Sequence, residues 1–132
     1  MKQEEKIRLL KIRFDKSKES YEIAEEMSES HPSFSINRYY YSLYYAVTGV
    51  LLFTEAEAKT HKGIIVEFNK QLVKTGIFSV EDGRLLTKVF QWRTKGDYDD
   101  NQEYSTEDVD TIRKPVRELL NKLEDYSLKI AK

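Results

Sequence analysis

The sequence predicts an all-α fold, an antiparallel up-and-down bundle of four to five helices. Charged residues make up 34% of the 132 residues, and the chain has only five Gly and two Pro. This composition supplies few turns and long solvated faces, which favours helices over many short strands. Apolar residues also recur at spacings of three and four through most of the chain, as they do along one face of a helix.

Length and residue usage limit the function classes. A chain of this length fits one core, so we expect a single helical domain over residues 1–132. There is no Cys and there are only two His, which argues against disulfides, zinc sites and thiol nucleophiles; we expect no metal and no cofactor. No segment approaches the ~20 apolar residues of a membrane span or resembles a signal peptide, so we expect a cytoplasmic protein with no membrane partner.

The first helix is expected over about 3–29, where a mostly apolar stripe repeats every three or four residues. The segment His31-Pro32-Ser33 interrupts this pattern, because Pro cannot continue a hydrogen-bonded helix and restricts the residue before it. A second helix is therefore expected to begin near Ser35. The stripe of the first helix consists of Ile7, Leu10, Phe14, Ser17, Tyr21, Ala24 and Ser28.

Residues 36–53 predict a central helix, because apolar or aromatic residues lie on almost every side and Arg38 is the only charge. Such a helix is either buried all round or packed on a core on one side and on an interface on the other. Its tyrosines suit an interface, so we expect a homodimer through Tyr41, Tyr45 and Gly49. Gly49 either permits close approach of another backbone or is simply tolerated.

The third helix is expected to begin after Thr60, an N-cap residue, and to end at Gly76. Capping-box patterns at 79–82 and 105–108 open the last two helices, and Gly96 ends the fourth. Pro115 lies inside the fifth pattern, whose apolar stripe keeps its phase across it. This predicts a kinked helix or a single-turn offset, not two separately oriented helices. The buried row of the third helix is His61, Ile65, Phe68 and Leu72.

Two arginines break the apolar pattern, and such breaks often mark function. Arg38 shares a helical row with Tyr41, Ser42, Tyr45 and Gly49. It either pairs with an acid or stacks on a Tyr, or it contacts an anion or nucleotide.

Arg93 continues the apolar row Leu86 and Phe90, and Asp97 follows one turn later, which predicts an Arg–Asp pair. Residues 84–95 contain four basic side chains and no acid, whereas 97–110 contain seven acids and no base. Part of this polarity complements the helix dipole, but the cationic end could equally hold a phosphate.

His61 follows the Thr60 cap, where the helix N-terminus disfavours a protonated imidazole. It is either a neutral base or a packed side chain. The acidic loop formed by Asp97, Asp99, Asp100 and Glu103 is expected to be solvated, since it lacks the spacing of an EF-hand. Phosphate-binding loops, nucleophile elbows and metalloprotease motifs are all absent.

Several segments together resemble the small stand-alone prokaryotic branch of the HEPN superfamily, from about residue 17 to 128. They are residues 36–46 (INRYYYSLYYA), Thr60-His61-Lys62-Gly63, Phe68, Val73-Lys74-Thr75-Gly76, and Arg93 with Gly96-Asp97-Tyr98. The resemblance implies an antiparallel bundle that dimerises through its central helices. It also implies association with nucleotides, RNA or a partner nucleotidyltransferase, often in toxin–antitoxin or defence operons.

Active members of this superfamily are metal-independent ribonucleases that use an Arg followed four to six residues later by a His. Here Arg93 is followed by TKGDYDD, so Tyr98 occupies that spacing. A neutral imidazole can accept a proton from a ribose 2′-hydroxyl near neutral pH, whereas a tyrosine hydroxyl, with a reference pKa of about 10, is mostly protonated there. His61 could supply a base if the fold brings it to Arg93.

Three interpretations follow. The first is a non-catalytic HEPN module that binds a nucleotide, RNA or a nucleotidyltransferase partner. The second is a ribonuclease with an unorthodox base, and the third is a purely structural dimer. The candidate ligand-binding residues are Arg38, His61, Lys62, Arg93, Asp97 and Tyr98.

Overall fold

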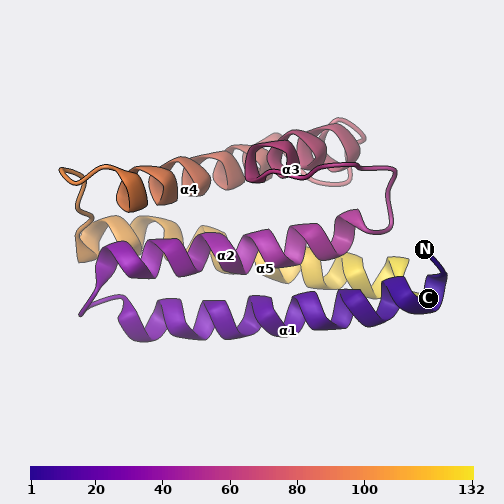
Figure 1. Cartoon of the computed structure of the whole chain (residues 1–132), viewed down its shortest axis with the longest axis horizontal. Helices are drawn as coiled ribbons and strands as arrows, with labels where there is room; N and C mark the ends of the chain where they lie inside the picture. Colours follow the sequence, from indigo (N-terminus) through magenta and orange to yellow (C-terminus); the bar gives the residue numbers. More distant parts are fainter.

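The computed structural model describes residues 1–132 as a bundle of helices (Figure 1). Each of the four long helices runs opposite to the one before it, and the two chain termini lie at the same end. The predicted all-α antiparallel bundle is confirmed. The long helices are α1 (Gln3–Met27), α2 (Pro32–Leu51), α4 (Val80–Tyr98) and α5 (Thr106–Ile130); α3 (His61–Phe68) is short and continues into a π-helical turn, η1 (Asn69–Val73).

The central element is α2, which packs against α1, α4 and α5. Its largest fully buried side chains are Ile36, Tyr39, Tyr40 and Leu43, and burying an apolar side chain of this size stabilises the fold by roughly 1.5–3 kcal/mol. A Cβ atom on Gly49 would lie 3.1 Å from Cβ of Arg13, so this glycine allows α1 of the same chain to approach α2 closely. None of the helices combines the length and the apolarity needed to cross a bilayer.

The predicted helix boundaries rest on local hydrogen bonds. Thr60 Oγ1 accepts from Gly63 N at 2.9 Å and caps α3, while Gly76, with φ of +81°, ends the segment that includes η1. Both capping boxes are formed, because the backbone N–H and side chain of the N-cap serine each bond to the aspartate three residues later. Caps of this kind contribute about 1 kcal/mol each.

Of the two predictions based on the prolines, the structure contradicts one and confirms the other. Helix α2 begins at Pro32, so the predicted start near Ser35 is wrong. Proline is well placed at the first helical position, because the N–H that it lacks would have no partner there. Helix α5 runs without interruption through the exposed Pro115, so the prediction that this segment does not form two separately oriented helices is confirmed, and no break marks a single-turn offset.

The π-helical turn η1 was not expected from the apolar periodicity. Lys74 N donates to Asn69 O at 2.9 Å, which closes the wider turn, and Asn69 Nδ2 donates to Ile65 O at 2.9 Å. A Cβ atom on Gly83 would lie only 2.2 Å from Asn69 Oδ1, so the absence of a side chain at this position lets α4 pack against the π turn.

Candidate ligand-binding site

Helices α2 and α4 together build an alternating row of aromatic rings and guanidinium groups. Its members in order are Phe34, Arg38, Tyr41, Arg93 and Tyr98, which we call the aromatic–guanidinium row. Arg38 Cζ lies 5.8 Å from the centre of the Phe34 ring and 4.7 Å from that of Tyr41. Arg93 Cζ lies 5.3 Å from the Tyr41 ring centre and 5.8 Å from that of Tyr98. All four separations are within the range of cation–π attraction.

Arg93 is the structural anchor of the row. Its side chain is only 12% exposed, and its Nε lies 2.9 Å from Asp97 Oδ2, so the predicted Arg–Asp pair is confirmed. The Nε–H does not point at that oxygen, which makes the contact an ion pair without an aligned hydrogen bond. Arg93 Nη2 donates to the Tyr41 hydroxyl at 3.0 Å, and Asn37 Nδ2 donates to the same Asp97 oxygen at 2.9 Å. These bonds fasten α4 to α2.

Arg38 has no carboxylate within ion-pair distance. Its Nε donates to Asn37 Oδ1 at 3.0 Å, and its guanidinium lies over the Tyr41 ring. The structure thus shows the stacking on a tyrosine that the sequence allowed, and no acidic partner. The charge of Arg38 is therefore the one in the row that remains available to an anion, whereas that of Arg93 is compensated by Asp97.

His61 lies beside the row, because the start of α3 packs against α2. A hydrogen bond of 2.7 Å joins its Nδ1 to the Tyr40 hydroxyl, and its ring centre lies 4.5 Å from that of Tyr44. Burial and the nearby charge of Arg93 lower the pKa of His61, and burial raises the pKa of Tyr40. The imidazole is thus packed against Tyr40 and Tyr44, and its surroundings disfavour the protonated form.

The tautomer of His61 decides what its other nitrogen can do. If the Tyr40 hydroxyl donates to Nδ1, then Nε2 carries the proton and can only donate. If Nδ1–H donates to the hydroxyl oxygen instead, Nε2 keeps a lone pair and can act as a base.

The remaining predicted residues have different surroundings. Lys62 is exposed and makes no ion pair, and Tyr98 has 75% of its surface exposed at the end of α4. Tyr45 is half-buried beside Tyr41 with the Lys16 ammonium 5.6 Å from its ring centre, while Gly49 faces α1. The row therefore brings together Arg38, Arg93, Asp97 and Tyr98, with His61 next to it, and leaves Lys62 outside.

Four residues at the site were not predicted from the sequence: Phe34, Asn37, Tyr40 and Tyr44. Phe34 lies one helical turn before Arg38 and is 49% exposed, so extending the Arg38 row backwards would have found it. The bonds of Asn37 to Asp97 and of Tyr40 to His61 join residues far apart in sequence and leave no local signal.

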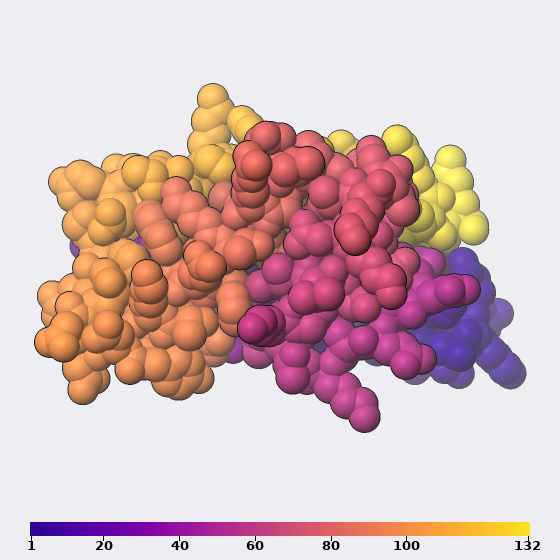
Figure 2. Space-filling model, turned by 90° about the horizontal axis from the view of Figure 1, so that it is seen from above, coloured from indigo at the N-terminus to yellow at the C-terminus, as the bar shows by residue number.

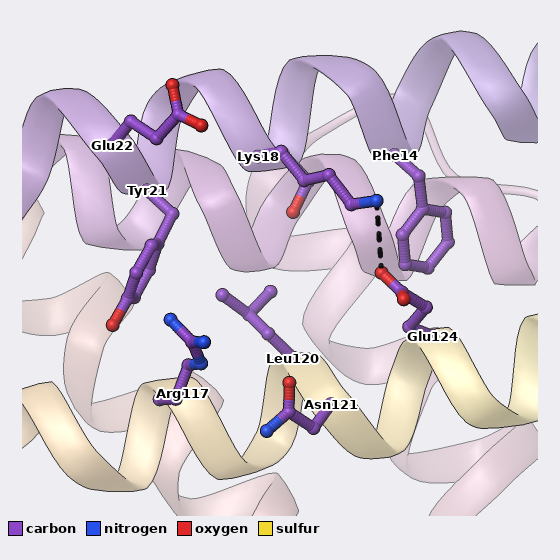
Figure 3. Close-up of a pocket in the computed structure, with 9 residues that line it drawn as sticks. Phe14, Lys18, Tyr21, Glu22, Arg117, Leu120, Asn121 and Glu124 are labelled. Atoms are coloured by element: carbon purple, nitrogen blue, oxygen red, sulfur yellow. Dashed lines mark ion pairs between the residues drawn. The ribbon is translucent and has the colours of Figure 1, made fainter.

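A separate recess of about 350 Å³ lies between α1 and α5 (Figure 3). Lys18 of α1 pairs across it with Glu124 of α5 at 3.5 Å, and Arg117 lies 5.2 Å from the ring centre of Tyr21. None of the residues predicted to bind a ligand lines this recess. The candidate site is therefore the row between α2 and α4.

The chain belongs to the HEPN domain family, whose sequence model matches residues 10–126. A UPF0332 protein of Thermotoga maritima is 38% identical over 81 residues, which cover 61% of this chain and 61% of that protein. The chain thus matches less than two thirds of the length of this relative. Two proteins of Methanocaldococcus jannaschii, each named a putative toxin, are 30% identical over 113 and 96 residues. Those alignments cover 85% and 65% of this chain, and 77% and 72% of the relatives.

Proposed function

We propose that this protein is a HEPN module that binds single-stranded RNA through the aromatic–guanidinium row. The observation that carries the proposal is the unpaired guanidinium of Arg38, which is set between the exposed ring of Phe34 and the Tyr41 ring. Single-stranded nucleic acids are bound by cations that contact phosphates and by aromatic rings on which bases stack. In this proposal Arg38 contacts a phosphate, and Phe34 and Tyr98 stack on bases.

The names of the two Methanocaldococcus relatives support a toxin–antitoxin setting for this activity. We propose a cytoplasmic homodimer that works with a partner protein, for which a nucleotidyltransferase is our candidate. In this proposal the protein alone binds RNA without cutting it readily, because no His follows Arg93 at the ribonuclease spacing.

A second candidate function is metal-independent RNA cleavage with His61 as the base. The observation that favours it is the lowered pKa of an imidazole close to Arg93. In this mechanism Nε2 takes the proton of a ribose 2′-hydroxyl, and that oxygen attacks the adjacent phosphorus to form a 2′,3′-cyclic phosphate. The bond from phosphorus to the 5′-oxygen of the next nucleotide breaks, and water donates a proton to that leaving oxygen. It needs the tautomer in which Nδ1–H donates to Tyr40.

The two candidates are separated by measuring binding and cleavage on the same samples. A labelled unstructured RNA oligonucleotide is titrated at low salt, where phosphate contacts are strongest, against wild type, Arg38→Gln and Phe34→Ala. We expect each change to weaken binding about tenfold, since one charge-assisted contact or one stacked base is worth about 1.4 kcal/mol or more. Arg8→Gln, on the exposed surface of α1, is the matched control and should bind as wild type does.

The cleavage measurement then separates the binding module from the ribonuclease. Rapid cutting by the wild type in the presence of a chelator, abolished in His61→Ala, would replace the binding proposal by the ribonuclease. Absence of any RNA binding at low salt would overturn both and favour a structural dimer. Circular dichroism of each variant checks that the helices are retained.

A further inference from the structure

The layer formed by α3, η1 and α4 carries an excess of positive charge. Residues 61–98 contain seven basic and four acidic side chains, a formal balance of +3, although the whole chain has a net charge of −1. The rest of the molecule is therefore at −4. Figure 2 looks onto this layer, in magenta to orange, and shows that it covers most of one broad face of the molecule.

Five exposed cations of this layer form what we call the basic face. On α4, Arg84, Lys88 and Lys95 are four and seven residues apart, so they share one stripe opposite the buried Leu86 and Val89. At a rise of 1.5 Å per residue this stripe is about 16 Å long. The other two members, Lys70 and Lys74, are exposed on and just after η1.

These cations have almost no acidic partners within the protein, although the Lys88 ammonium lies 4.8 Å from the centre of the Trp92 ring. The four lysines have no carboxylate within ion-pair distance. Arg84 contacts Glu81 at 3.8 Å, but its side chain is 76% exposed, and such pairs contribute little. Asp82 does not neutralise the face, because it pairs with Lys122 of α5.

Folding requirements do not explain this arrangement. The helix dipole favours a cation in the last turn of α4, which accounts for Lys95, but it disfavours Arg84 near the N-terminal end. Like charges spaced four residues apart on a helix destabilise it by a few tenths of a kcal/mol. An unpaired cluster of this kind is expected where a polyanion supplies the missing charge.

Between η1 and α4 the basic face contains a shallow recess of about 260 Å³. Arg84 and Lys88 line it together with the polar side chains of Asn69, Thr87 and Gln91. Amides, hydroxyls and cations together are the usual protein contacts to phosphate and sugar. Because Gly83 has no side chain, Asn69 can sit against α4 at this recess.

We propose that the basic face binds the phosphate backbone of an RNA strand that continues into the aromatic–guanidinium row. This inference rests on the proposed function, since it takes RNA as the ligand of the row. The stripe on α4 leads from Arg84 to Lys95 and so towards Tyr98, which ends the same helix and belongs to the row. RNA fits better than an acidic protein, because only a nucleic acid would also use the exposed rings of Phe34 and Tyr98 for stacking.

Salt dependence of RNA binding tests the proposal. For single strands the slope of log K against log[salt] is about −0.7 per phosphate contact. The triple variant Arg84→Gln/Lys88→Gln/Lys95→Gln should therefore flatten the slope by about 2. This corresponds to an affinity loss of roughly 100-fold at 0.1 M salt. All three positions are exposed, so the fold is retained.

The matched control is Lys2→Gln/Arg8→Gln/Lys11→Gln, which removes the same number of charges from the exposed surface at the N-terminus and α1. If both triple variants flatten the slope of log K against log[salt] equally, RNA binding at the basic face is overturned. Only an effect of net charge then remains. Equal displacement of RNA by poly-glutamate of the same charge would also overturn it, in favour of an acidic protein partner.

The result for Arg38→Gln separates this proposal from the function on which it rests. If Arg38→Gln weakens binding while the basic-face variant keeps the wild-type slope, only the basic face is wrong. If the basic-face variant flattens the slope and Arg38→Gln binds as wild type does, the row is wrong. Failure of the wild type to bind RNA at low salt overturns both.

Discussion

Replacing Arg93 with alanine should destabilise the fold measurably, because one side chain joins α4 to α2. The change removes a charge-assisted hydrogen bond to the Tyr41 hydroxyl, worth about 1.5 kcal/mol. It also removes the contact with the Tyr41 ring, worth about 0.5 kcal/mol, and the ion pair with the partly exposed Asp97, worth up to about 1 kcal/mol. We expect a loss of about 2–3 kcal/mol in the free energy of unfolding, or about 10 °C in Tm.

Urea denaturation followed by circular dichroism at pH 7.5 measures this loss. Arg84→Ala is the control, since that side chain is exposed and its removal should change stability by no more than about 0.5 kcal/mol. A double-mutant cycle with Tyr41→Phe isolates the hydrogen bond and should give a coupling energy of about 1 kcal/mol. Equal stability of Arg93→Ala and Arg84→Ala, or a cycle without coupling, would show that Arg93 does not fasten α4 to α2.

Two further predictions concern pH and assembly. Because the pKa of His61 is lowered on folding, the folded state binds fewer protons than the unfolded state as the pH falls through about 6.5. Stability should therefore fall between pH 7.5 and 5.5, and urea midpoints should show a smaller fall in His61→Phe; identical pH profiles would contradict this. Sedimentation at micromolar concentration should show a dimer that Tyr45→Glu shifts towards monomer, and a 15.6 kDa species alone in the wild type would contradict dimerisation.

The helices were predictable from the sequence because their signals are local. The two capping boxes, the Thr60 cap and the left-handed Gly76 each act within a few residues, and the structure forms all of them. The Arg93–Asp97 pair was predictable for the same reason, since residues four apart on a helix are neighbours. The start of α2 was placed too late because proline was taken as a helix breaker, although it is favoured at the first position of a helix.

The part of the site that could not be predicted depends on contacts between segments that are far apart in the sequence. Asn37 meets Asp97 across 60 positions, and Tyr41 meets Arg93 across 52. Apolar periodicity shows which face of a helix is buried, but it does not show which residues of two packed helices meet. The π turn that begins at Asn69 was also not predicted. A π-helix closes its hydrogen bonds over one more residue than an α-helix does, and over only five residues this barely changes the spacing of the apolar side chains.

The assembly of the aromatic–guanidinium row from two helices has a thermodynamic consequence. An unfolded chain separates Arg38 from Arg93 and Tyr98, so a ligand that needs both helices binds the folded state and not the unfolded one. Ligand at 100 times its Kd then adds about 2.7 kcal/mol to the free energy of unfolding. Melting curves at rising RNA concentration would thus report occupancy of the site without any label on the RNA, and the stabilisation would be smaller in any variant that detaches α4 from α2.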